Sequence, residues 1–161
     1  MDYFPIQTLP ERKISRTKIF NETYRNEKYV IDEYLEDFLY YEMTPIEEIE
    51  FDDKHSVPWQ YFSLDGLNYL LPRIIYLIQL KIDDLSISLL DFIINMTINE
   101  SLTLLISTLN KYDLSIIESV IENIIFETNE EIVSAIGEYY LFLDLEFIQT
   151  QKNNYGLLLP N

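Results

Sequence analysis

The segment most informative about the fold is WQYFSLDGLNYLLPRIIYL, residues 59–77. Its apolar residues recur at the spacing of a helix, yet Gly66 and Pro72 both disfavour a helix interior. Gly66 falls where the first helical turn would lie, so its cost is small and a neighbouring segment can pack closely on it. Pro72 lies further in and removes one backbone hydrogen bond. We therefore predict a helix over residues 64–82 that is bent near residues 68–72.

Signals for helix starts recur along the chain. Ser63 is placed to cap the helix just described, because its hydroxyl can accept a hydrogen bond from a backbone N–H of the first turn. Four capping boxes, each a Thr or Ser followed three residues later by Glu, begin at Thr8, Thr44, Ser115 and Thr128. Together with the apolar spacing they predict helices over residues 9–20, 26–42, 45–50, 86–97, 100–110 and 129–149 and from residue 115 onward, with a loop over 51–60.

These helices predict a single all-α domain over residues 1–161, a compact bundle of about six to seven helices. Apolar residues make up 48% of the chain, enough for a packed core. We expect the segment 86–97 to be buried nearly all round, Ile87 included. The terminal stretches 1–8 and 152–161 are expected to be loose. The last helix should point four side chains inward: Ile132, Ile136, Tyr139 and Leu143.

Charge is the most unusual feature of the composition. Lys and Arg number 11 and Asp and Glu 28, which gives a net charge of −17. Nucleic acids and anionic membrane surfaces would both be repelled, so we expect neither as a direct partner. A basic protein is the natural complement, since opposite potentials accelerate encounter. The alternative is that the charge only keeps the chain in solution.

Nothing in the sequence points to export or to a membrane. The chain has no Cys, which excludes disulfides and thiol chemistry. Its first residues lack the basic and apolar regions of a signal peptide. The longest apolar runs are interrupted by charged residues or proline before they reach the roughly 20 residues of a membrane span. We therefore expect a cytoplasmic protein.

Residues suited to catalysis or metal binding are scarce. The chain has one His and no Cys, which excludes ordinary zinc sites. Asp52 and Asp53 lie close to His55 in the sequence, but the spacing and the glycine of a calcium loop are missing, so His55 is expected to be an exposed loop residue. No G-x-S-x-G element is present, and paired carboxylates arise by chance among so many acids. We expect no cofactor, no metal and no enzymatic activity.

One stretch combines acids with aromatic residues: DEYLEDFLYYEMTPIEEIEFDD, residues 32–53. Aromatic side chains anchor interfaces, and carboxylates orient basic partners. An amphipathic helix with its aromatic residues inside and its acids in water would give the same pattern, and it explains Tyr34 and Phe38 equally well. The predicted partner-binding residues are Asp32, Glu33, Glu36, Asp37, Tyr40, Tyr41, Glu47, Glu48, Glu50, Asp52 and Asp53.

The pattern W-x(4)-L-D-G-x-x-Y-x-L-P, from Trp59 to Pro72, resembles an element of a poorly characterised family of small acidic bacterial proteins. Members of that family carry F-L-s-x-E-G-x-x-Y-Y-L-P after a loop with a tryptophan. Here Asp65 replaces the Glu and Leu70 replaces one Tyr. The run NKYDLSIIESVIENII is similar to the family's capped helix, and the resemblance extends over residues 30–127. It implies an all-α fold without a known activity and, by association with secreted toxins, an immunity role. It carries over no functional residues.

The sequence thus predicts a non-enzymatic cytoplasmic binding protein, most concretely an immunity protein that neutralises a basic bacterial toxin by charge-complementary docking. The cognate toxin domain would be its partner, and a homo-oligomer is compatible with the sequence. Two alternatives stay open. One is an acidic mimic of nucleic acid that inhibits a nuclease or a DNA-binding protein. The other is a structural or housekeeping helical protein whose acids only confer solubility.

Overall fold

A computed structural model describes residues 3–158, and the side chains of residues 3–154. In this part of the chain the regular structure is helical, which confirms the predicted all-α class. The α-helices are α1 Glu22–Arg25, α2 Lys28–Met43, α3 Leu64–Leu80, α4 Ile87–Asn95, α5 Glu100–Thr108, α6 Lys111–Glu127, α7 Glu130–Ile136 and α8 Glu138–Leu158. Single 3₁₀ turns lie at Arg16–Lys18, Ile46–Glu48, Asp53–His55 and Trp59–Tyr61.

Helix α3 is the predicted central helix, and it begins where the sequence indicates. Ser63 Oγ accepts a hydrogen bond of 2.9 Å from the backbone N–H of Gly66, which confirms Ser63 as the N-cap. Gly66 packs directly on the backbone of Ile19: a Cβ atom at residue 66 would lie 2.0 Å from the Ile19 carbonyl oxygen. Pro72 lies inside the helix. The bend expected around it stays a prediction.

An aromatic core joins α2 to the segments on either side of it. The ring of Phe20 packs against those of Phe38 and Phe62, with centroids 4.4 and 4.7 Å apart. Trp59 packs in turn on Phe51, with centroids 5.8 Å apart. All five rings are buried. Because large aromatic rings contribute much buried area in tilted contacts, this core holds α2 against the segment that precedes α1 and against the connection that follows α2.

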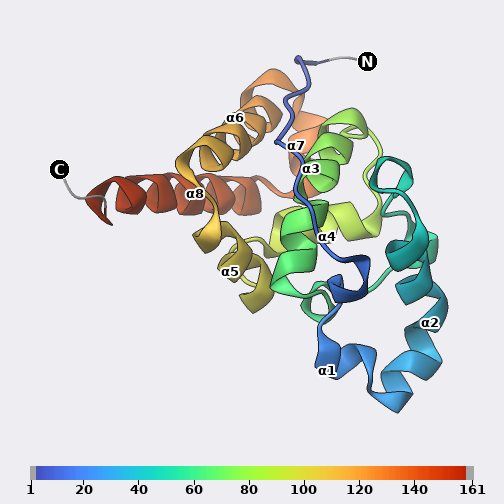
Figure 1. The fold of residues 1–161 in the computed structure, drawn as a ribbon. Helices are drawn as coiled ribbons and strands as arrows, with labels where there is room; N and C mark the ends of the chain where they lie inside the picture. Colours follow the sequence, from blue (N-terminus) through green and yellow to red (C-terminus); the bar gives the residue numbers. More distant parts are fainter. Residues whose placement is uncertain (1–2, 159–161) are drawn as a thin grey trace.

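The C-terminal half is built on the pairing of α6 with α8. These two helices pack along each other, and α8 also contacts α4, α5 and α7. The inner face of α6 carries Ile117, Val120, Ile121 and Ile124, which are all buried and recur three or four residues apart. In Figure 1, α6 and α8 lie on one side of the molecule and α1 and α2 on the other.

The helix predicted over residues 9–20 does not form. Residues 3–15 have no regular structure and cross the surface of α3 (Figure 1), before the 3₁₀ turn at Arg16–Lys18. Gln79 of α3 is buried; its side chain accepts from the N–H of Gln7 at 2.8 Å and donates to the Gln7 carbonyl at 2.7 Å. The apolar face of a helix here would be too narrow to bury, whereas the extended segment obtains hydrogen bonds from Gln79.

The helix predicted over residues 129–149 is two helices, α7 and α8, which part at Gly137. The φ angle of Gly137 is 112°, a conformation that side-chain-bearing residues rarely adopt. Ile132 and Ile136 are buried, as predicted, but the break leaves Tyr139 70% exposed, against the prediction that it points inward.

The prediction for α4 is wrong at its first residue. Ile87 is exposed, and the segment is therefore not buried all round. Ile87 follows the Ser86 N-cap directly and faces outward, whereas Ser88 and Leu89 of the same turn are buried.

None of the four predicted capping boxes caps a helix. The N-cap of α6 is Asn110, whose Oδ1 accepts from the N–H of Asp113 at 2.8 Å, so this helix starts earlier than predicted. The N-cap of α7 is Asn129, whose Oδ1 accepts from the N–H of Ile132 at 3.0 Å. Asn caps a helix at least as well as Ser or Thr. Asn110 and Asn129 directly precede the first turns of α6 and α7.

The prediction of loose termini falls in part on residues 1–2 and 159–161, which lie outside the described residues. Within the described part, helix α8 continues to Leu158. On it, Lys152 Nζ donates to Glu118 Oε1 of α6 at 2.7 Å. The described portions of both terminal stretches are thus bonded to the rest of the fold.

Candidate partner-binding surfaces

The predicted acidic stretch does not form one surface. Asp32, Glu33 and Glu36 are exposed on α2, as a partner-binding role requires. Asp37, on the same helix, is half-buried; burial raises the pKa of its carboxyl group, and the charge of a neighbouring Glu36 adds to that effect. Glu47 and Glu48 are exposed separately, on the 3₁₀ turn Ile46–Glu48.

The two predicted tyrosines lie inside the fold. Tyr41 is buried in the aromatic core, and its hydroxyl donates to the carbonyl of His55 at 2.7 Å. Burial raises the pKa of that hydroxyl. Tyr40 is half-buried, stacks on the His55 ring with centroids 3.8 Å apart, and accepts from the backbone N–H of Glu50 at 3.1 Å. His55 is therefore half-buried, and the expectation of an exposed residue there is wrong.

Glu50 links the connection after α2 to helix α3. Its carboxylate accepts from Arg73 at 3.2 Å and from Lys81 at 2.8 Å. Arg73 also donates to the carbonyl of Ile49 at 2.8 Å. Both basic partners come from α3, so this carboxylate is already engaged within the chain.

The last two aspartates of the stretch, Asp52 and Asp53, act as caps. Asp52 accepts from the backbone N–H groups of Lys54 and His55 at 3.1 and 3.2 Å, at the start of the turn Asp53–His55. Asp53 accepts from the backbone N–H of Ile87 at 2.8 Å, at the start of α4. These bonds satisfy backbone donors that the turn and the helix leave free. Among the described residues, no group of three or more acidic or histidine side chains is arranged to hold a metal ion.

Sequence reasoning missed the apolar residues on the outer face of α2. Leu35, Leu39 and Met43 recur every four residues and form one exposed stripe, with Met43 74% exposed. Tyr29 is 67% exposed at the start of the same helix. Exposed Asp32, Glu33 and Glu36 lie among them. The four-residue spacing of Leu35, Leu39 and Met43 is visible in the sequence. In the same segment the aromatic residues of the buried face give a stronger helical pattern, and the prediction followed that pattern. We call Tyr29, Asp32, Glu33, Leu35, Glu36, Leu39 and Met43 the α2 face.

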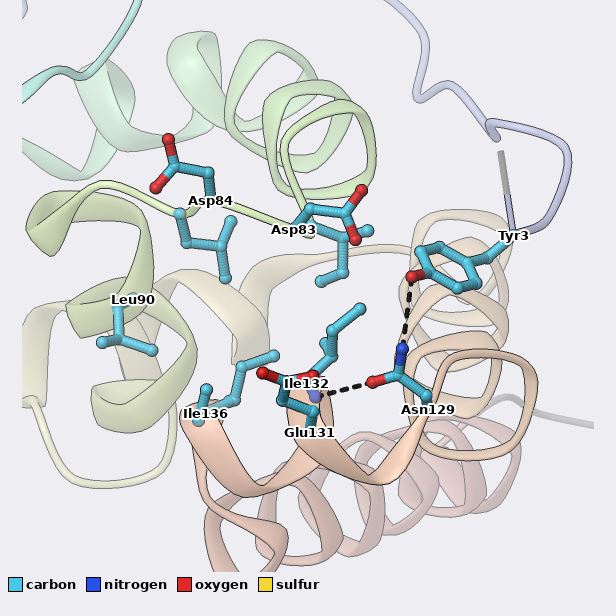
Figure 2. A pocket seen from close by; sticks show the side chains of 11 residues that line it. Tyr3, Asp83, Asp84, Leu90, Asn129, Glu131, Ile132 and Ile136 are labelled. Carbon is cyan, nitrogen blue, oxygen red and sulfur yellow. Dashed lines mark hydrogen bonds between the residues drawn. The ribbon is translucent and has the colours of Figure 1, made fainter. Parts of the chain in front are cut away.

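A pocket of about 400 Å³ lies between the N-terminal segment, the α3–α4 connection and α7, and its lining side chains are drawn in Figure 2. Its apolar wall includes Leu90 and Ile132. Tyr3 lies at one side, where its hydroxyl accepts from Asn129 at 3.3 Å and also interacts with Asp83. These contacts tie the N-terminal segment to the start of α7.

A second hollow, of about 540 Å³, lies on the other side of α7, between the end of α6 and the start of α8. We call it the α7 groove. Its apolar lining includes Ile125 and Phe126 of α6, Val133 of α7 and Phe142 of α8. Glu130 and Glu138 line it as well.

Helix α8 carries a carboxyl group in the core. Asp144 is fully buried, and neither of its carboxylate oxygens has a hydrogen-bond partner among the described residues. Burial raises the pKa of this carboxyl group to about 8. Asp144 is therefore largely protonated near neutral pH.

No protein-family model matches the chain, and neither a curated protein nor a solved structure matches it. The fold and its surfaces are therefore the basis for any functional proposal. Within the described residues, no single helix is both long and apolar enough to cross a membrane; α4 and α5 reach that length only together, with a 70° bend between them.

Proposed function

We propose that the protein is a non-enzymatic binding protein that neutralises a basic partner protein, as a bacterial immunity protein neutralises a toxin in the cytoplasm. The observation that carries this proposal is the α2 face, where exposed apolar side chains alternate with exposed carboxylates. Scattered exposed apolar residues are common on protein surfaces. A stripe of Leu35, Leu39 and Met43 on one helix, bordered by acids, is the composition of an interface centre with a charged rim.

The two kinds of side chain have different tasks in this proposal. The carboxylates attract the basic partner over a distance and set its orientation, which mainly raises the association rate. The apolar stripe is buried on contact and excludes water, which mainly slows dissociation. Together they would cover the basic substrate-binding surface of the toxin.

The α2 face is presented on a firmly held helix. Arg25 of α1 forms a two-bond ion pair with Glu42 of α2, at 2.9 and 3.1 Å, and its guanidinium lies over the ring of Phe38. Arg16 donates to the carbonyl of Thr44 at 2.7 Å, just beyond the end of α2. A preformed surface loses little conformational entropy on binding, which favours affinity.

The test needs a candidate partner, which is a secreted basic domain encoded by a gene beside this one, and it measures binding by surface plasmon resonance at ~0.15 M salt. The wild type is expected to bind. Charge reversal by Glu33→Lys and Glu36→Lys should reduce the association rate by about tenfold, and Leu39→Ser with Met43→Ser should raise the dissociation rate by about tenfold.

The matched control is Leu104→Ser, which removes an exposed leucine from α5. It should leave both rates unchanged. No binding of the wild type to the neighbouring toxin would contradict the proposed function. Equal association and dissociation rates for the α2 variants and the control would show that the α2 face is exposed to solvent but does not contact the partner.

A further inference from the structure

The α7 groove concentrates exposed aromatic area. Phe126 is 64% exposed at the end of α6, and Phe142 is 42% exposed near the start of α8. The two residues lie on different helices, yet both line the same hollow, together with Ile125 and Val133. A single exposed Phe needs no explanation. Two that line one concave site give it the character of a binding pocket for an apolar side chain.

The charge around the α7 groove selects its occupant. Glu130 and Glu138 line it, and among the described residues no Lys, Arg or His does. In the described part of the chain, neither carboxylate has an ion-pair partner. An anionic ligand is therefore disfavoured. A second copy of this chain, with its net charge of −17, is disfavoured for the same reason.

We infer that the α7 groove is a second protein-binding site, which takes an aromatic or aliphatic side chain from a partner segment that carries Lys or Arg on either side of it. The apolar side chain fills the space between Phe126 and Phe142, and the flanking cations meet Glu130 and Glu138. This site goes beyond the proposed function, because α6, α7 and α8 lie away from α2 (Figure 1).

The probe is the peptide acetyl-Lys-Lys-Phe-Leu-Lys-Lys-amide, titrated into ¹⁵N-labelled protein and followed by NMR. We expect saturable shifts of the backbone amide signals of Val133 and Ser134, which line the groove. Two comparison peptides separate the contributions. Replacing Phe-Leu by Ser-Gly should abolish saturation at these signals, and replacing the four Lys by Ser should weaken binding by about tenfold.

Matched variants locate the site. Phe126→Ser and Phe142→Ser should each weaken peptide binding by about tenfold. Tyr139→Ser is the control, because Tyr139 is 70% exposed on α8 but does not line the groove. To test the charges, the peptide affinity of the double variant Glu130→Gln, Glu138→Gln is compared with that of Glu127→Gln, which neutralises an exposed acid of α6 outside the lining. Only the double variant should bind the peptide more weakly.

Three outcomes would overturn the inference: no saturable shift at the groove signals, equal affinity for the Ser-Gly peptide, or the same loss in Tyr139→Ser as in Phe126→Ser. Shifts confined to the amides of Leu35 and Leu39 would also overturn it, while supporting the α2 face as the binding surface. Saturable binding at the groove alone would support this inference even where the toxin experiment fails, so the two proposals are separable.

Discussion

At residue 66 the backbone of one segment touches the backbone of another. The Ile19 carbonyl oxygen accepts from the backbone N–H of Ser63 at 2.9 Å and lies where a side chain on residue 66 would be. Glycine is thus required by a contact between residues far apart in the chain. The sequence indicated close packing at Gly66 but not the partner.

Gly66→Ala is expected to destabilise the protein. The new Cβ atom would lie 2.0 Å from a backbone oxygen, so the segment around Ile19 must move and lose its bond to Ser63. We expect a loss of about 2–4 kcal/mol in the free energy of unfolding, measured with urea, or no folded protein. Gln149→Ala, at an exposed position of α8, should change it by less than about 0.5 kcal/mol. A similar small change for Gly66→Ala would contradict the packing.

Asp144 predicts a specific pH dependence. Its pKa is raised to about 8 in the folded protein, while in the unfolded chain it has the ordinary value of 3.8. The folded state therefore holds an extra proton between these two values, and stability falls as the pH rises from about 4 to about 8. Below pH ~4 the carboxyl group is protonated in both states, and its contribution is fully present.

Asp144→Asn should remove this component, so the variant should be more stable than the wild type at pH 9 and lose less stability between pH 5 and pH 9. Urea unfolding across this range measures the difference. Glu146→Gln, which neutralises an exposed acid of the same helix, is the control and should follow the wild type. Parallel profiles for wild type and Asp144→Asn would show that Asp144 does not carry a raised pKa.

At the scale of the elements, single side chains cap the starts of most of the α-helices. Six of the α-helices are capped by an Asn or Ser that bonds to the first turn, at Asn21, Ser63, Ser86, Asn99, Asn110 and Asn129. A capping box is a local pattern, and it functions only where the chain enters a helix from an extended residue. Ser115 lies well inside α6, so its hydroxyl has no free N–H to accept from.

The start of α6 gives a direct comparison. Asn110→Ala should lower the free energy of unfolding by about 1 kcal/mol, because the N–H of Asp113 loses its acceptor. Ser115→Ala should change it by less than about 0.5 kcal/mol, since Ala is the better helix former. Thermal or urea unfolding of both variants measures the difference. A larger loss for Ser115→Ala would place the helix start where the capping box predicts it.

Elements with a wide apolar face were predictable, and the others were not. The bounds of α2, α3, α4 and α5 agree with the predicted ranges to within about two residues. The segment 9–20 has capping signals but little to bury, and it runs extended because Gln79 bonds to its backbone. The break at Gly137 was invisible to periodicity, because the apolar spacing continues across it.

At the scale of the whole molecule, the acidic side chains fall into two groups: some bond to other groups of the same chain, and others are exposed to solvent. Glu50, Asp52 and Asp53 bond to the chain's own groups, as do Tyr40 and Tyr41, and their part in partner binding stays a prediction. The acids that stay exposed on α2 are joined there by apolar residues that the prediction omitted. The two proposed surfaces, the α2 face and the α7 groove, thus share one composition, exposed apolar side chains bordered by acids.

The helical class, the central helix with its Ser63 cap and the acidic character of the surface could be read from the chain alone, because periodicity, capping and charge are local properties. The tertiary structure alone decided which acids are free, where Asp144 lies, and that Phe126 and Phe142 line one groove. These facts depend on contacts between residues distant in the chain. Each local pattern is compatible with several such arrangements, and the packing of the core selects one of them.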